Sequence, residues 1–408
     1  MSAQEQVDTD FFAFQGGLNQ VTPALAIPQG TLLDVQNYEP AVGGGYARTS
    51  GYERYSGQLA PSAAVITPVA CTLTSTPTAG DTVTCGAVTA LFVKVIGGGM
   101  LVVSASGTFP AKTAIMDGAV QVGTTAAVTS LGTPGTPQDD AQNALDAGNV
   151  LRNLIGPVPG SGPVRGVWML NGVVYAWRDN AAATAGAVYA ASATGWTVVP
   201  LQFELKFNTG VAGALAITEG ATIKGTTSGA TAIVARVCRE TGVFNTGNAT
   251  GRFIVKPVSG TFQGGETIKC AVDSFTAVCA TLLGPATQIT IQPGGKYQFA
   301  NGSFNGAASS LRMYGVSGVD RAFEFDGTTY VPINSTAATD TPSYVSVVNN
   351  YLYLAIQSSM FNSSLVNPYG FEVTTGAAQI AVGDTITGLQ QLRGSAMAIL
   401  PATAPSNC

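Results

Sequence analysis

Apolar and polar positions alternate along many short stretches of this chain, which is the period of half-buried β-strands. The clearest case is Val164–Trp177, VRGVWMLNGVVYAW, in which two alternating runs flank Asn171-Gly172. Asn-Gly between two such runs predicts a β-hairpin, because both residues of its two-residue turn take a positive φ. The pattern therefore predicts two antiparallel strands joined by a tight turn.

The same layout recurs further along the chain at nearly regular spacing. Turn pairs stand between apolar runs at Asn301-Gly302, Asn349-Asn350 and Arg393-Gly394. From Asn301 to Asn349 is 48 positions, and from Asn349 to Arg393 is 44. From Asn171 to Asn301 is 130, of which we expect roughly 80 to belong to an insertion. A period near 45 residues predicts β-propeller blades.

Two further segments predict more strands of these blades. Gly186–Pro200 gives two strands around Thr194-Gly195, which would complete the blade that begins at Val164. Ser310–Ile333 has turn pairs at Ser317-Gly318 and Asp326-Gly327. Turns about every ten residues are typical of a meander of short strands.

Residues 61–131 and 207–285 share a composition rich in Thr, Ala, Val and Gly, and they share an order of motifs. An identical Ser-Gly-Thr-Phe follows a β-branched strand in both, which favours duplication over convergent Thr/Val composition. We therefore expect two copies of one small β domain, inserted between the blades. The corresponding motifs are Thr82-Val83 and Thr222-Ile223, Leu91-Phe92-Val93 and Ala232-Ile233-Val234, Leu101–Phe109 and Phe253–Phe262, and Thr113-Ala114-Ile115 and Glu266-Thr267-Ile268.

One segment, Gln138–Ile155, predicts a helix. Asp139 and Asp140 lie in its first turn, where they suit the helix dipole, and Gly156-Pro157 ends it. We expect an apolar stripe made of Ala141, Leu145, Leu151, Leu154 and Ile155.

The N-terminal segment Phe11–Gly57 is broken by Gly16-Gly17, Gly43-Gly44-Gly45 and three prolines, which predicts an extended strap. Tyr46–Tyr55 alternates aromatic and polar residues and could form a strand.

The strap also carries motifs that resemble the N-terminus of tail proteins of short-tailed bacteriophages, in particular the nozzle or tubular tail protein family. A second stretch, Asn367–Leu389, is similar to a late-blade segment of the same family. The resemblance implies a propeller-bearing tail component that assembles as a ring around the DNA channel. The N-terminal motifs are Gly16-Gly17-Leu18-Asn19, Ile27-Pro28-Gln29-Gly30, Asn37-Tyr38-Glu39, Gly45–Arg48 and Gly51–Tyr55.

Together these patterns predict an all-β protein with partial propeller-like blades, two similar inserted β domains and one short helix. The expected division is a strap with the first propeller strands at 1–60, β domain 1 at 61–131, and the helix with the first full blade at 132–206. β domain 2 follows at 207–285, and further blades at 286–408. The fourth blade begins only near Arg393, and PATAPSNC after Leu400 does not alternate. We therefore expect an open arc whose last edge a neighbour covers.

Composition narrows the classes of function. Charged residues make up only 10 % of the 408 residues, the net charge is −5, and basic residues form no cluster along the sequence. We therefore do not expect a basic groove that binds nucleic-acid phosphates. So few charges also suggest a surface partly covered by neighbouring subunits. The N-terminus has no secretory pattern, and the most apolar stretch, Ala90–Val103, is interrupted by Lys94 and glycines, so no membrane span is expected.

The chain has no histidine, which argues against Ser-His-Asp and Cys-His catalysis and most zinc sites. Six cysteines occur without a CxxC pair, which favours free, buried thiols in a cytosolic product. A disulfide between Cys270 and Cys279 remains open if the strands that carry them pair. These cysteines are Cys71, Cys85, Cys238, Cys270, Cys279 and Cys408.

Several acidic, glycine-rich and aromatic positions are candidates for a chemical role. Propellers host glycosidases, which need paired carboxylates, and Asp320, Glu324, Asp326 and Asp384 are the candidates. Turns already account for Asp326 and Asp384, so we expect no catalytic residues, no cofactor and no metal. The glycine-rich stretches Gly160–Gly166 and Gly294-Gly295-Lys296 lack the context of phosphate loops. Trp168, Trp177 and Trp196 are expected to pack between blades, with a sugar-stacking platform as the alternative.

The function that these expectations favour is structural and non-enzymatic. We expect a virion tail protein, assembled in the host cytoplasm, that forms a ring, contacts adaptor or fibre proteins and lets viral DNA pass without sequence-specific binding. An acidic lining with few bases would keep the DNA from adhering. One alternative is a carbohydrate-binding or depolymerising tail protein that acts on the host surface. Another is a head-to-tail joining protein.

Overall fold

The computed structural model describes residues 64–402, apart from 132–136, 193–194, 211–216, 271–276, 305, 308–309 and 393–395, and short pieces before residue 64. The chain divides into two compact units, Met1–Arg54 and Tyr55–Cys408. In the first unit, β1 (Tyr38–Pro40) pairs only with β2 (Tyr46–Arg48). The expected strap is therefore described only in part, and its two described strands form their own sheet and do not join a blade.

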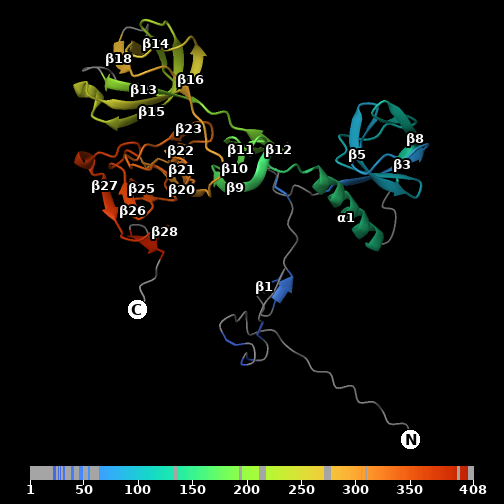
Figure 1. The fold of residues 1–408 in the computed structure, drawn as a ribbon. Helices are drawn as coiled ribbons and strands as arrows, with labels where there is room; N and C mark the ends of the chain where they lie inside the picture. Colours follow the sequence, from blue (N-terminus) through green and yellow to red (C-terminus); the bar gives the residue numbers. More distant parts are fainter. Residues whose placement is uncertain are drawn as a thin grey trace. The chain divides into compact units, whose positions relative to one another are not determined.

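The first inserted segment folds as a closed six-stranded barrel, here called barrel 1 (Figure 1). Its strands pair in the cyclic order β3-β6-β5-β4-β7-β8. Alternate apolar side chains point inward, and Phe109 of the Ser-Gly-Thr-Phe motif is buried among them. The strands are β3 (Ile66–Leu73), β4 (Thr82–Cys85), β5 (Val88–Ile96), β6 (Gly99–Val103), β7 (Ala114–Asp117) and β8 (Val120–Ser130).

The second inserted segment, barrel 2, has the same strand order. β13 pairs with both β16 and β18, which closes the cycle β13-β16-β15-β14-β17-β18, and Phe262 is buried as Phe109 is in barrel 1. The expectation of one fold used twice is confirmed at the level of strand order, although barrel 2 begins at Phe203, earlier than expected. Its strands, with the short β19 that follows, are β13 (Phe203–Gly210), β14 (Thr222–Gly225), β15 (Thr231–Thr241), β16 (Thr250–Ser259), β17 (Thr267–Cys270), β18 (Ala277–Leu282) and β19 (Thr287–Gln288).

One of the expected correspondences is wrong by a single residue. Thr82 of β4 pairs with Leu91, whereas the equivalent Thr222 of β14 pairs with Ile233, so Leu91 corresponds to Ile233. Phe92 then corresponds to Val234, and both are buried in their barrels. The shift matters because neighbouring residues of a strand face opposite sides of the sheet.

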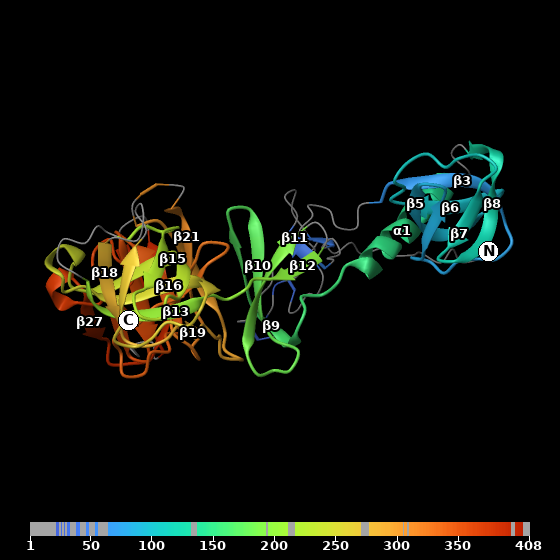
Figure 2. The same cartoon turned by 90° about the horizontal axis from the view of Figure 1, so that it is seen from above.

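The helix α1 spans Pro137–Leu154, close to its expected bounds, and packs on the outside of barrel 1 against β3, β5 and β6 (Figures 1 and 2). The expected apolar stripe is wrong for Ala141, Leu145 and Leu154, whereas Ile155 is buried and Leu151 is partly buried. Leu145 and Leu154 are half exposed, and the helix buries Ala147 and Val150, with Leu151 partly buried beside them. The side of the helix that faces barrel 1 therefore carries Ala147, Val150 and Leu151.

Most of the remaining described residues form three propeller-like blades, each a four-stranded antiparallel meander. Blade 1 consists of β9 (Ser161–Leu170), β10 (Val173–Asp179), β11 (Gly186–Ser192) and β12 (Gly195–Val198). Blade 2 consists of β20 (Gln298–Gly302), β21 (Arg312–Val316), β22 (Phe323–Phe325) and β23 (Tyr330–Pro332). Blade 3 consists of β24 (Tyr344–Val348), β25 (Tyr351–Ile356), β26 (Ser359–Asn362) and β27 (Ala378–Ala381). The C-terminal hairpin pairs β28 (Ile386–Leu392) with β29 (Ala396–Pro401).

Two of the four predicted turn pairs are tight turns. Asn171-Gly172 joins β9 to β10 with φ of 50° and 80°, and Asn349-Asn350 joins β24 to β25 with φ of 50° and 62°. Arg393-Gly394 lies outside the described residues. The Asn301-Gly302 turn is wrong, because both residues belong to β20 and pair with β21.

Gly302 has a packing reason in place of a turn. A Cβ atom there would lie 2.6 Å from Cγ1 of Val347 on β24, so glycine lets the first strands of blades 2 and 3 approach closely. Gly166 of β9 has the same role between blades 1 and 2, because a Cβ atom at Gly166 would lie 2.5 Å from Cβ of Tyr297. First strands of consecutive blades are in contact, β9 with β20, β20 with β24 and β24 with β28. Consecutive blades therefore still follow one another along the chain, although Asn301-Gly302 is not a turn.

The blade core is one continuous apolar cluster that runs through blades 1, 2 and 3. Trp177 of β10, 1 % exposed, contacts the rings of Tyr297, Phe299, Phe323 and Phe325 in blade 2. Ile254 and Cys238 of barrel 2 belong to the same cluster. Barrel 2 therefore shares a core with the blades, and the polar contacts at this junction can be described in detail.

Candidate functional site

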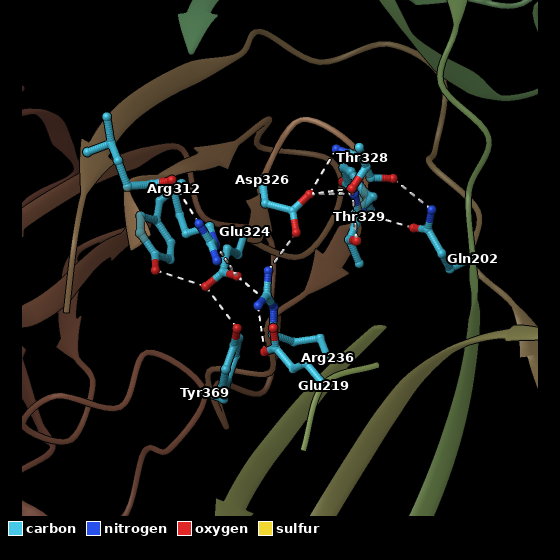
Figure 3. A network of polar contacts seen from close by, with 12 residues as sticks. Gln202, Glu219, Arg236, Arg312, Glu324, Asp326, Thr328, Thr329 and Tyr369 are labelled. Carbon is cyan, nitrogen blue, oxygen red and sulfur yellow. Dashed lines mark hydrogen bonds and ion pairs between the residues drawn. The ribbon is translucent and has the colours of Figure 1, made fainter. Parts of the chain in front are cut away.

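Glu324 and Asp326, the strongest carboxylate candidates in the sequence, lie where barrel 2 meets blade 2. Glu324 is on β22, and Asp326 follows the end of that strand. Both contact Arg236, which β15 of barrel 2 supplies from about ninety residues earlier (Figure 3). We call Glu219, Arg236, Arg312, Tyr314, Glu324, Asp326 and Tyr369 the charged junction.

Glu324 is buried at the centre of the charged junction. Its Oε2 accepts hydrogen bonds from the hydroxyls of Tyr314 and Tyr369, each at 2.8 Å. Its Oε1 lies 3.0 Å from Nε of Arg236 and 3.8 Å from Nε of Arg312. Burial raises the pKa of Glu324 and outweighs the opposing effect of Arg236 and the tyrosines. Both carboxylate oxygens are thus engaged by protein groups from barrel 2, blade 2 and the segment after β26.

Asp326 divides its two oxygens between a turn and the junction. Oδ1 accepts the backbone N–H groups of Thr328 at 2.8 Å and Thr329 at 2.7 Å, which is the expected turn role. Oδ2 accepts from Nη2 of Arg236 at 2.8 Å. Burial alone would raise the pKa of Asp326, but these hydrogen bonds and Arg236 lower it below its usual value.

Arg236 joins three carboxylates. Besides Asp326 it donates through Nη1 to Glu219 at 2.6 Å, and Glu219 is half exposed. Its Nε is within ion-pair distance of Glu324 but is not directed for a hydrogen bond, so that contact is an attraction of opposite charges. The side chain of Arg236 is 6 % exposed. A guanidinium buried this deeply needs such partners to offset the loss of hydration.

A second buried arginine extends the junction. Arg252 of β16 donates through Nη1 to Glu204 at 2.7 Å and through Nε to Glu240 at 2.6 Å. Oε1 of Glu240 also accepts from the side-chain amide of Asn334, which follows blade 2. Burial would raise the pKa of Glu204, but Arg252 lowers it overall. The two arginines together attach barrel 2 to the blades by charge as well as by apolar packing.

Backbone contacts reinforce the same attachment. Asn367 and Glu372 lie in the segment after β26 of blade 3. The side-chain amide of Asn367 donates to the backbone carbonyl of Arg239, and the carboxylate of Glu372 accepts the backbone N–H of Gly242. Gln202, just before β13, donates to the carbonyl of Thr328 at 2.8 Å. Barrel 2 is therefore bonded to blade 2 and to the segment that follows β26 of blade 3.

A cavity of about 390 Å³ lies beside the charged junction. Its wall includes Arg236, Arg312 and Glu324, together with the aromatic rings of Phe304, Tyr314 and Tyr369. The charges on this wall are already paired with each other, so the cavity offers hydrogen-bonding and aromatic surface without a surplus of either charge.

The other two carboxylate candidates do not join Glu324 and Asp326. Asp320 accepts the backbone N–H of Gln292 at 3.0 Å and of Arg321 at 2.8 Å. Asp384 accepts the N–H of Thr385 at 2.7 Å in an exposed turn before β28. The candidates thus divide into one buried pair and two separate turn residues.

The tryptophans divide between two environments. Trp177 packs between blades 1 and 2 as expected, and Trp168 stacks on Phe299 of blade 2 while its Nε1 donates to Asn301 at 2.8 Å. Trp196 instead packs on the other face of blade 1, in a cluster with Ala176 and Tyr189. The expectation of packing between blades is confirmed for two of the three.

The glycine-rich stretches have structural roles. Residues 161–166 belong to β9, and the N–H of Gly294 donates to Oδ1 of Asp179 at 2.8 Å. Cys270 and Cys279 are joined by a disulfide, the arrangement that the sequence had left open. Cys71, Cys85 and Cys238 are free and buried, and Cys408 lies outside the described residues.

Among the described residues, no group of three or more Cys, Asp or Glu side chains is placed to hold a metal ion. In the same part of the chain, no helix has the length and apolar character needed to cross a membrane.

The sequence did not single out Arg236, Arg252 or Tyr369. The available signal was a lone arginine in an apolar strand, as in Ala232–Cys238 (AIVARVC). A charge in that position calls for a buried partner, but its partner is far away in the sequence and only the fold brings the two together. Comparison with protein-family models and with curated protein sequences finds no match for this chain.

Proposed function

We propose that this chain is a structural protein of a bacteriophage tail, which assembles as a ring and forms part of the conduit for DNA ejection. The observation that carries the proposal is an apolar face at the end of the row of blades. On blade 1, Val167 is 53 % exposed, Met169 58 % and Val198 62 %. A neighbouring subunit would bury this face.

The strand register places this face opposite the one that packs on blade 2. Val167 pairs with Ala176, Ala176 with Tyr189, and Tyr189 with Val198, so the four lie on one side of the sheet. Val158 and Trp196 already cover Ala176 and Tyr189 in the middle of this side, and Val167 and Val198 remain exposed on either side of them. Trp177, one residue on from Ala176, faces blade 2. Inside the chain, blade faces of this kind are covered by the next blade, and an exposed apolar patch marks an interaction site.

A ring of such subunits suits a passive conduit. The net charge of −5 and the absence of a basic cluster disfavour tight binding of a polyanion. The charged junction attaches barrel 2 to the blades through paired charges, which suits a rigid wall. The N-terminal resemblance to nozzle proteins agrees with this role.

The test is the assembly state of the purified chain. Native mass spectrometry and negative-stain electron microscopy are expected to show rings with a through-channel. Val167→Asp with Met169→Asp should abolish them, because two charges would be buried in the contact. Val128→Asp, at a position of barrel 1 that is 73 % exposed, is the matched control and should leave the rings intact. A wild-type chain that stays monomeric at tens of micromolar would refute the proposal.

A further inference from the structure

The two barrels carry the same kind of residue pair at the same place. In barrel 1, Lys94 on β5 lies opposite Leu101 on β6, and in barrel 2, Arg236 on β15 lies opposite Ile254 on β16. Each pair follows a register shift in its sheet, after Phe92 in barrel 1 and after Val234 in barrel 2. A bulge re-aims the next side chains, so in both barrels one cation and one aliphatic residue face outward.

Each pair is covered by another element of the chain. Leu101 is 1 % exposed and packs with Ala147 and Val150 of α1, whereas Ile254 is fully buried in the core shared with the blades. Lys94 donates to Asp146 of α1 at 2.6 Å, just as Arg236 donates to Asp326 beside blade 2. On barrel 1, α1 thus takes the place that blade 2 takes on barrel 2.

We propose that the outward face of the third and fourth strands is a docking surface that both barrels retain from a common origin. It takes an element that presents a carboxylate beside apolar side chains, and the cation after the bulge is the residue that positions it. The occupant on barrel 1 is α1 of the same chain. The helix is then a fixed part of barrel 1.

The two occupants are held with different strength. Arg236 is buried and contacts three carboxylates, but the Lys94 and Asp146 side chains are 33 % and 29 % exposed. A cavity of about 470 Å³ also lies between α1 and barrel 1, beside Lys94 and Val93. Helix docking on barrel 1 should therefore weaken with added salt, which acts far less on the buried junction of barrel 2.

Asp146 is well placed to meet the lysine. Its other oxygen accepts the side-chain amide of Gln142, one turn earlier on the helix, at 2.7 Å. These two hydrogen bonds, from Lys94 and then from Gln142, lower the pKa of Asp146 and keep it ionised at neutral pH. Val150 follows at four positions and so lies beside Asp146 on the same side of the helix, and it is buried with Ala147 against barrel 1.

The test uses charge reversal in the full chain, read by amide hydrogen exchange of α1. Lys94→Glu sets two carboxylates against each other, so exchange of the helix amides should rise about tenfold. Asp146→Lys alone should have a similar effect. The double variant Lys94→Glu with Asp146→Lys restores an opposite pair and should return exchange to within about twofold of the wild type. Exchange of the barrel 1 core strands reports whether the barrel itself stays folded.

Lys112→Glu is the matched control, because it makes the same charge change at another exposed lysine of barrel 1. It should leave α1 as protected as in the wild type. Unchanged protection of α1 in Lys94→Glu, or no recovery in the double variant, would overturn the proposal. A third outcome is that protection of α1 recovers only when the two single variants are mixed. Barrel 1 would then hold the helix of another copy of the chain, which would overturn the assignment of α1 within one copy.

Discussion

Glu324 is the residue where sequence and structure give the most different accounts of one carboxylate. In the sequence it stands two positions from another acid, a spacing that a glycosidase could use. In the structure its oxygens accept from Tyr314 and Tyr369 and lie against Arg236 and Arg312. Its partners come from three distant parts of the chain, so the residue connects them whether or not it has another role.

Replacing Glu324 by Ala is expected to destabilise the protein by about 2–4 kcal/mol, because the buried hydroxyls of Tyr314 and Tyr369 lose their acceptor and Arg236 loses one of its carboxylates. Chemical denaturation measures this. Asp384→Asn, in an exposed turn, is the control and should change stability little. We also expect no cleavage of bacterial polysaccharide or peptidoglycan by the wild type. Turnover that either substitution abolishes would contradict the structural role.

The charged junction also predicts how stability depends on pH. Hydrogen bonds and arginines lower the pKa values of Glu204 and Asp326, so the stability they add is present above pH about 4 and is lost as the pH falls through their folded values. Glu324 acts in the opposite sense, because its raised pKa lets the folded state bind a proton first. Its removal should therefore make the loss of stability on acidification start at higher pH. Melting temperatures of wild type and Glu324→Gln between pH 7 and 3 test this, and parallel curves would argue against it.

At the scale of elements, glycine has two structural roles, in a tight turn and at a close contact between strands. The sequence pattern does not distinguish these two roles. Gly172 is in a tight turn with φ of 80° and has free space around it. Gly302, which also follows an asparagine, lies in a strand against Val347 of the next blade. Both glycines follow an asparagine, so the sequence pattern is the same at the two sites. Only the packing in the folded protein distinguishes the turn at Gly172 from the strand at Gly302.

These two glycines should respond differently to substitution. Gly302→Ala should cost about 1–3 kcal/mol through overpacking between blades 2 and 3. Gly172→Ala should cost about 1–2 kcal/mol through backbone strain alone, and Gly172→Val should disrupt blade 1 because a β-branched residue strongly disfavours positive φ. Urea denaturation of the three variants gives the comparison. A Gly172→Val protein that melts and assembles like the wild type would mean that the tight turn is not formed in solution.

Sequence patterns predicted the elements better than their contacts. Period-two alternation located most blade strands, and shared motifs located two barrels with one strand order. The helix bounds were close, yet its buried side was wrong because Leu145 and Leu154 are exposed and Ala147 is not. Which face an element buries depends on its neighbour, and here the neighbour is a docking surface on barrel 1. Arg236 and its carboxylates could not be paired from sequence for the same reason.

At the scale of the molecule, the blades form a row whose consecutive first strands touch, from β9 through β20 and β24 to β28. Among the residues that the structure describes, three blades have four strands and the C-terminal hairpin has two. One end of the row exposes Val167 and Met169 of blade 1, and at the other end Leu400 of β29 is half exposed. Propellers normally close with four to eight blades. These two ends can therefore contact each other either within one copy of the chain or between neighbouring copies. The proposed ring requires contact between neighbouring copies.

A cysteine cross-link between the two ends separates these cases. We expect Val167→Cys with Leu400→Cys to give a ladder of covalent oligomers after mild oxidation of the assembled protein, because the last element of one copy would lie on blade 1 of the next. A contact of unlike surfaces that repeats around an axis closes into a ring, so the ladder should end at the ring order. All variants carry Cys408→Ser, so that each single cysteine variant is a control that should give dimers at most, because Cys71, Cys85 and Cys238 are buried. An internal cross-link within a monomer, which migrates faster on a non-reducing gel, would mean that the blades close within one copy and that the open arc is wrong.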